Sequence, residues 1–247
     1  MREDREMSLV DHLSELRSRI VWVLVVLVAA MIGGLFAAER ILEFLKEAAL
    51  AKDVSWNVFS PWDAIRVYMQ IAFVIALSAA MPIALIQMWS FVKPGLRMPE
   101  RKAALKYIPW AILLFFGGLA FGYRVVFPMA FQFTLAVTHG LGLTETYGIT
   151  QYFSFMFNII IPLSLLFELP VLVMFLTRIR VLNPMRLQKM RRYAYMLLIV
   201  IATMVTPPDI ISDLLVTIPL ILLFELSVIL SRIVYRKQLA EEQSWIT

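Results

Sequence analysis

The sequence predicts an all-α integral membrane protein with six transmembrane helices, an amphipathic cytoplasmic N-terminal helix and two short C-terminal spans. Of its 247 residues, 61% are hydrophobic and the mean hydropathy is +0.79, whereas soluble domains are nearer half apolar. Apolar runs also recur at about the 20 residues that a helix needs to cross a hydrocarbon core of about 30 Å. The expected spans are residues 20–38, 65–92, 108–127, 152–177, 193–206 and 214–231, within a single membrane domain over 1–247.

The N-terminal segment is expected to form an amphipathic helix that runs into the first span. Ser8 is placed to cap it, and Asp11 lies in its first turn, where a negative charge favours the helix dipole. Apolar side chains then recur at helical spacing. Glu15 lies on the polar side, four residues before Arg19. Physics alone favours an ion pair between these two on a solvated face.

The outer loops are expected to differ in length and character. Residues 39–64 carry mixed charges with Trp56 and Trp62, which suits a short helix at the membrane interface. Residues 128–151 are expected to form a long, nearly uncharged loop. The fifth span has about 14 residues between Arg192 and Pro207, or roughly 21 Å of helix, and a tight turn joins it to the sixth.

Lysine and arginine are distributed unevenly between the two sides of the expected bundle. The N-terminus, the second and fourth loops and the C-terminus together carry 18, whereas the opposite loops carry three. The positive-inside rule therefore predicts that both termini lie in the cytoplasm. The net charge of +5 follows from this topology and requires no nucleic-acid partner.

The sequence offers little for enzymatic chemistry. It has no cysteine, which excludes thiol catalysis and cysteine-ligated metals. Its two histidines, His12 and His139, are far apart, and the HExxH pattern of metalloproteases is absent. We expect a protein that is not an enzyme and needs no cofactor.

Two carboxylates stand inside apolar runs of similar sequence. Glu168 lies in PLSLLFEL at residues 162–169, and Glu225 lies in PLILLFEL at residues 219–226. Carboxylates within the membrane are costly and by default suggest function. Glu168 lies about 15 Å before Arg178 and Glu225 about 10 Å before Arg232, so Glu168 is expected to lie deeper. For each, an interhelical hydrogen bond stays open as the alternative to a functional role.

Six short motifs resemble, in order, those of the C subunit of the twin-arginine protein translocase (TatC family). They are HLSELRSR at 12–19, QMWSF at 87–91 followed by PGL at 94–96, PERK at 99–102, VVFP at 125–128, FELP at 167–170 and TPPD at 206–209. They fall in register with the six expected spans and cover nearly the whole chain. The resemblance implies a plasma (inner) membrane protein that binds signal peptides with two consecutive arginines and begins the export of folded proteins.

The resemblance also assigns roles to particular residues. Glu15 and Glu100 would meet the two arginines, and a carboxylate is the best match for a guanidinium. Arg17 and Phe91 would lie beside the peptide. The residue pattern leaves an alternative for Glu100, since after Pro99 it suits the first turn of a helix. Glu168 would be an intramembrane polar site.

The resemblance further implies partners. Small single-span subunits of the TatA/TatB type would dock at the outer end of the last helix, near Thr206 and Asp213. Copies of the chain would assemble in the receptor complex, and the proton-motive force would drive export. Asp209 has a structural alternative from its position, because it can cap the helix that follows Pro207 and Pro208.

Three positions depart from the family pattern. Pro99 stands where relatives often have histidine, Arg124 where they have an apolar or aromatic residue, and Asp213 where they commonly have glutamine. The last departure bears on partner docking.

One other function class fits the composition. A small ion- or proton-coupled transporter could use Glu168 and Glu225, with Pro162 and Pro219 disrupting the helices around them. Against it, no inverted repeat is visible.

Overall fold

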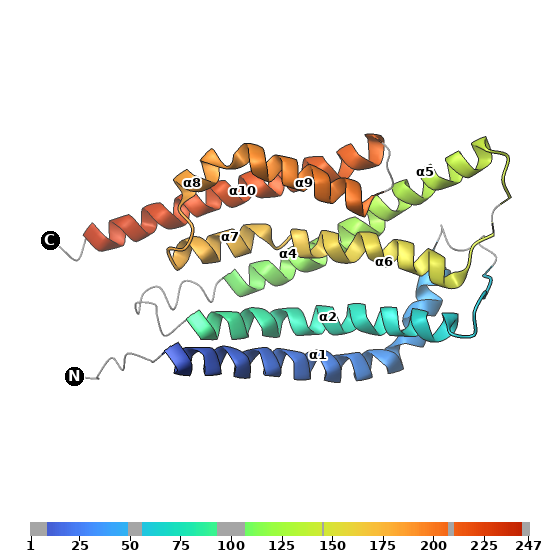
Figure 1. Cartoon of the computed structure of the whole chain (residues 1–247), viewed down its shortest axis with the longest axis horizontal. Helices are drawn as coiled ribbons and strands as arrows, with labels where there is room; N and C mark the ends of the chain where they lie inside the picture. The colour runs from blue at the N-terminus through green and yellow to red at the C-terminus, as the bar shows by residue number, and fades with distance from the viewer. Residues whose placement is uncertain (1–8, 49–55, 93–106, 145, 207–209, 244–247) are drawn as a thin grey trace.

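The computed structural model describes residues 9–48, 56–92, 107–144, 146–206 and 210–243, and these fold almost entirely into helices (Figure 1). Within those ranges the β pairing is a single isolated bridge between Asn57 and Gly148. The helices are α1 (Leu9–Lys46), α2 (Asp63–Val92), α4 (Tyr107–Phe121), the π-helical turn η2 (Gly122–Val126), α5 (Phe127–Gly140), α6 (Ile149–Leu166), α7 (Leu169–Arg178), α8 (Pro184–Lys189), α9 (Arg191–Val205) and α10 (Ile210–Gln243).

Five helical stretches in the described ranges are long and apolar enough to cross a membrane: Ser14–Lys46, Asp63–Phe91, Ile108–Gly140, Ile149–Arg178 and Asp213–Ala240. The predicted all-α membrane fold is therefore confirmed. The remaining candidate, α9, has 15 residues, or about 22 Å of helix. Its standing as a sixth span remains a prediction.

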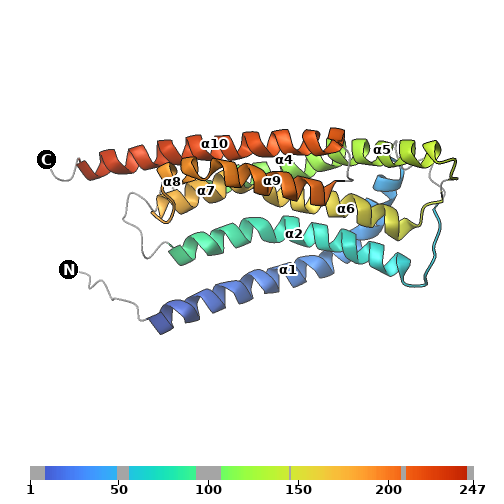
Figure 2. The same ribbon diagram turned by 45° about the horizontal axis from the view of Figure 1, so that its top comes forward.

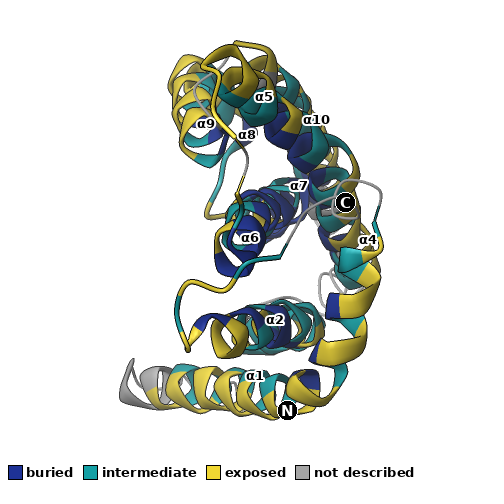
Figure 3. Ribbon diagram, turned by 90° about the vertical axis from the view of Figure 1, so that its right-hand side faces the viewer, coloured by how far each residue is buried: buried dark blue, intermediate teal, exposed yellow. Residues whose placement is uncertain are grey.

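The helices form a curved array with α6 and α7 at its centre. Figure 2 shows α1 and α10 at opposite edges, and α1 begins at the same end of the bundle where α10 finishes. Most of α6 and α7 is buried, whereas the outer face of α1 is exposed (Figure 3). Many exposed side chains are large and apolar, such as Phe36 and Met204. A surface of this kind is suited to lipid rather than to water.

The third long helix extends well past its expected end. Residues 128–140, expected as loop, continue the helix as α5. Pro128 cannot donate to the carbonyl four residues before it. The chain accommodates this with η2, in which the Phe127 N–H bonds the Gly122 carbonyl, and π-helical turns of this kind keep a helix continuous.

The first helix also differs from expectation. Residues 39–46, expected in a separate interfacial helix, are the last turns of α1. Leu42 within this segment, and Ala38 just before it, are buried in the main core. Burial in this core thus holds the segment in the spanning helix.

The loop before α2 is fastened to the start of α6. Asp63 Oδ2 accepts hydrogen bonds from the Phe59 and Ser60 N–H groups, both at 2.9 Å, and so ties the loop to the first residue of α2. The Thr150 hydroxyl donates to the Asp63 carbonyl at 3.2 Å. Trp56 adds ring contacts to Tyr152 and Phe153, with centroids 5.1 and 5.6 Å apart. These contacts fix the beginnings of α2 and α6 together.

Glycine allows α4 to approach α6 closely. A Cβ added at Gly118 would lie 2.7 Å from the Ser164 Cα and 3.0 Å from Phe167. The adjacent Gly117 is exposed, and a Cβ there would meet nothing within 4 Å. Only one glycine of this pair is required by packing.

We therefore predict that Gly118→Ala destabilises the protein and Gly117→Ala does not. Overpacking against backbone atoms costs about 1–3 kcal/mol, whereas alanine at the open position gains about 1 kcal/mol of helix propensity. Unfolding of the detergent-solubilised variants, followed by circular dichroism, measures both. Equal stability of the two variants would show that α4 can move away from α6 without cost.

Candidate functional site

A polar cluster joins α1 to α2 near the beginning of α1. Arg19 forms an ion pair with Glu15 one turn earlier, and its Nε lies 3.2 Å from Glu15 Oε1. Its Nη1 donates to Gln87 Oε1 of α2, also at 3.2 Å. The i,i+4 pair expected from the spacing is confirmed. The bridge to Gln87 in addition ties the two helices together.

A narrow groove of about 230 Å³ lies beside this cluster, between α1 and α2. Its lining is apolar except for Arg19 and Gln87, and Phe91 closes it at the end of α2. Arg17 is exposed on the same helix but does not line it. The groove therefore brings together Phe91 and the partner of Glu15, with Glu15 at its edge.

Glu15 is only partly available for a new contact. Its side chain keeps 25% of its accessible surface, and one of its oxygens already holds Arg19. An incoming guanidinium could bind the open side or replace Arg19, since both cations offer the same forked donors. Glu100, the other predicted contact, lies outside the described residues.

Glu168 stands at a break in the central helix. α6 ends at Leu166 and α7 begins at Leu169, so Phe167 and Glu168 form the turn between them. Pro170 follows at once and cannot donate to the Leu166 carbonyl. Glu168 is only 4% exposed, and neither of its oxygens has a hydrogen-bond partner among the described residues.

The similar stretch in α10 behaves differently. Pro219 lies inside an unbroken helix of 34 residues, and serine stands two residues after Glu225, where Pro170 stands two residues after Glu168. Glu225 is held by α9, where Arg191 Nη2 lies 2.6 Å from its Oε2 and the Tyr195 hydroxyl bonds its Oε1. Glu225 is thus an interhelical polar contact, which was the structural alternative.

The two carboxylates also lie at different depths. The hydroxyls of Thr177 in α7 and Ser231 in α10 are 2.7 Å apart and mark one level, and the two helices run in the same direction (Figure 1). Glu168 lies about 14 Å before that level and Glu225 about 9 Å. The deeper position expected for Glu168 agrees with this spacing.

A third polar pair closes the hairpin between α9 and α10. The Thr206 hydroxyl donates to Asp213 Oδ1 at 2.8 Å and lies 3.0 Å from the Ala202 carbonyl. The structure thus brings together the two residues predicted to dock a partner. Asp209 falls in the part of the chain outside the described residues.

Sequence reasoning missed two partners in these clusters. Gln87 was noted only as part of a motif, and Arg191 only as a positive charge in a loop. Each lies on a different helix from its partner, 68 and 34 residues away, so no local spacing indicates either contact. Among the described residues, no three His, Asp or Glu side chains gather as a potential metal site.

Comparison with known proteins identifies the family. The model of the Sec-independent protein translocase protein (TatC) family matches residues 11–219. The chain is 47% identical to the Sec-independent protein translocase protein TatC of Halalkalibacterium halodurans, over 95% of this chain and 92% of that one. It is 43% identical to TatCy of Bacillus subtilis, over 94% and 91% of the two chains.

Solved structures agree. Two crystal structures of the twin arginine translocase receptor TatC superpose with TM-scores of 0.76 and 0.78, at 28% and 29% sequence identity. They cover 90% and 89% of this chain, and 99% of each receptor chain is matched. With its six motifs, its helical array and these matches along almost its whole length, the chain belongs to the TatC family of Sec-independent protein translocase proteins.

Proposed function

We propose that this protein is the receptor subunit of a twin-arginine translocase, which binds twin-arginine signal peptides and begins the export of folded proteins. The observation that carries the proposal is the match along almost the whole chain to crystal structures of a twin arginine translocase receptor. It is a component of a transport machine rather than an enzyme.

The proposed recognition site is the beginning of α1 with the loop after α2. Two adjacent arginines are matched by two carboxylates, Glu15 and Glu100, through charge-assisted hydrogen bonds. Phe91 would pack against the apolar part of the peptide in the groove between α1 and α2. Arg17 would lie at the rim, where it sets the local charge.

The proposed location is the plasma (inner) membrane, with both termini in the cytoplasm. The excess of lysine and arginine on one side supports this orientation. The common end of the bundle at which α1 begins and α10 finishes supports it as well (Figure 1).

The proposed partners are single-span subunits of the TatA/TatB type, further copies of this chain and membrane lipid. The hairpin pair of Thr206 and Asp213 is the proposed docking point, because a carboxylate near an exposed helix end can accept hydrogen bonds from a neighbouring helix. The proton-motive force would drive export, with no bound cofactor.

The transporter alternative is weakened by one contact. It needs both intramembrane carboxylates to be free to take up and release an ion. Arg191 and Tyr195 hold Glu225, so Glu168 alone would have to carry that role.

We predict that Glu15→Gln and Glu100→Gln each weaken binding of a twin-arginine signal peptide by about tenfold or more. A hydrogen bond to a charged group contributes about 1.5–3 kcal/mol. Cross-linking of a labelled peptide to the variants measures the change, with a peptide carrying two lysines as the reference.

The matched control is Arg19→Gln, which removes the intramolecular pair but keeps the Glu15 carboxylate. Peptide binding should be retained in this variant, or should increase because a competitor is gone. If Arg19→Gln loses binding as fully as Glu15→Gln, Glu15 serves only to hold Arg19.

We predict opposite stability effects for the same substitution at the two buried glutamates. Glu168→Met should raise the free energy of unfolding by about 1–3 kcal/mol, because it removes a buried polar group without a partner. Glu225→Met should lower it, because Arg191 loses its carboxylate. Thermal unfolding in detergent micelles measures both.

Export in inverted membrane vesicles completes the comparison. A more stable Glu168→Met protein that exports a twin-arginine cargo more slowly would identify Glu168 as a functional residue maintained at a cost in stability. A normal export rate would leave it only a packing role.

The hairpin pair can be tested with two substitutions at one position. Asp213→Asn keeps an acceptor for the Thr206 hydroxyl but removes the charge, whereas Asp213→Ala removes both. We predict that both reduce cross-linking to a single-span partner subunit, Asp213→Ala more strongly. Normal cross-linking in Asp213→Asn would assign the carboxylate to the hairpin alone.

A further inference from the structure

We propose that the protein binds a membrane phospholipid at a defined site, with the lipid phosphate on Arg124 and an acyl chain in the apolar groove beside it. The site lies at the opposite end of the bundle from Glu15. It is independent of the signal-peptide site and does not rest on the proposed function.

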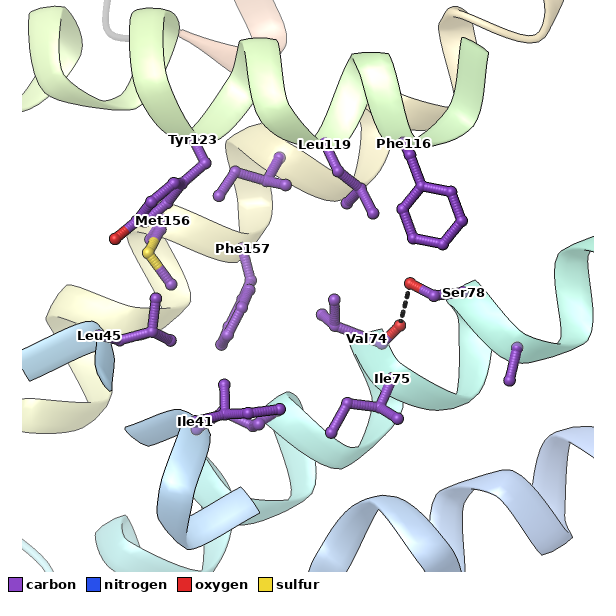
Figure 4. Close-up of a pocket in the computed structure, with 13 residues that line it drawn as sticks. Ile41, Leu45, Val74, Ile75, Ser78, Phe116, Leu119, Tyr123, Met156 and Phe157 are labelled. Carbon is purple, nitrogen blue, oxygen red and sulfur yellow. Dashed lines mark hydrogen bonds between the residues drawn. The ribbon is translucent and has the colours of Figure 1, made fainter. Parts of the chain in front are cut away.

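The acyl-chain part is a hollow of about 510 Å³ in the described residues (Figure 4). The end of α1, α2, α4, η2 and α6 surround it. Its lining is apolar apart from Tyr123 and Ser78, and the Ser78 hydroxyl already donates to the Val74 carbonyl at 2.8 Å. A lining that offers so few free polar groups suits a hydrocarbon chain, whereas an extended peptide would leave its backbone groups unsatisfied there.

A second, more polar hollow of about 200 Å³ lies next to this groove. The two share Leu45, Tyr123 and Met156, which Figure 4 shows together at one end of the groove. The second hollow adds Arg124 to its lining. An apolar groove and an exposed guanidinium therefore lie side by side.

The guanidinium is available for an anion. Arg124 is exposed on the π-helical turn η2, a backbone irregularity that often marks functional sites. Ion pairs in the described ranges join Arg19 to Glu15 and Arg191 to Glu225, and neither involves Arg124. Two carboxylates at the end of α1, Glu43 and Glu47, line neither hollow.

The depth of Arg124 matches a lipid headgroup. It lines the second hollow together with Leu45 at the end of α1 and Ala48 just after it, so it lies level with the end of the spanning stretch Ser14–Lys46. Lys46 at the end of α1 lies over the Trp56 ring, 5.8 Å from its centroid, and lysine and tryptophan are typical of this interface. A guanidinium there can grip a phosphate with two parallel hydrogen bonds.

A lipid accounts for both the apolar groove and the guanidinium beside it. A free phosphate would use Arg124 but leave the apolar groove unfilled, and an uncharged apolar molecule would leave the guanidinium without a partner. A phospholipid has one anionic group at the interface and a hydrocarbon chain directed to the membrane interior, in the same order as the site.

The test uses the full-length protein in nanodiscs of phosphatidylcholine with a small fraction of photoactivatable phosphatidylglycerol, the photoreactive group placed in the acyl chain. Mass spectrometry locates the labelled residues after illumination. We expect labels on α4 and α6 around Leu119 and Ile160, reduced about fivefold by Arg124→Gln and unchanged by Arg66→Gln. Arg66 is the matched control, an exposed arginine of α2 near the same end of the bundle that lines neither hollow.

Two further arms separate the alternatives. Soluble glycerol phosphate in excess should not reduce the labelling, and Ser78→Phe, which fills the groove, should remove the labels while Arg124 remains. Unfolding midpoints of the variants confirm that each is folded. Equal labelling of the wild type and Arg124→Gln, or displacement by glycerol phosphate alone, would overturn the lipid site.

Discussion

Hydrocarbon offers no partners for open backbone groups, so an interrupted helix can exist at membrane depth only where protein surrounds it. The break between α6 and α7 is such an interruption, and this constraint accounts for the arrangement of the molecule. α6 and α7 occupy the centre of the array, Gly118 lets α4 approach the residues just before the break, and α10 packs along α7. The same enclosure buries the carboxylate of Glu168.

Sequence reasoning predicted the features that depend on neighbouring residues and missed those that depend on distant ones. Apolar run length predicted the membrane helices, and the four-residue spacing predicted the pair of Glu15 with Arg19. The partners of Arg19 on α2 and of Glu225 on α9 depend on how the helices pack in three dimensions. Residue spacing along the sequence does not predict this packing. Pro162 and Pro219 stand at the same place in the two similar stretches and predicted similar disruption of both helices. Only the helix with Pro162, where Pro170 also follows, is broken. Pro128 was taken as a helix end because the π-helical turn before it has no local signature.

Whether a carboxylate has a partner follows its exposure. The carboxylates of Glu15 and Glu225 are partly exposed and each meets an arginine, whereas the almost fully buried Glu168 meets no partner in the described residues. A buried polar group of this kind is costly, and such groups persist mainly where they have a use. The Glu15 cluster lies near the beginning of α1, Glu168 lies in the middle of the array and the Thr206–Asp213 pair lies at the α9–α10 hairpin. The proposed sites for signal-peptide recognition, for intramembrane function and for partner docking are therefore spatially separate.

The shortness of α9 has a consequence in the plane of the membrane. With 15 residues, about 22 Å of helix, it falls short of a core of about 30 Å. If α9 crosses the membrane as predicted, the lipid beside it becomes thinner, at a cost of fractions of a kcal/mol for each Å. A neighbouring protein with an equally short helix would share that thinned lipid, so the total cost falls when the two lie side by side. The short length of the helix would thus favour association with another short helix, independently of any side-chain contact between them.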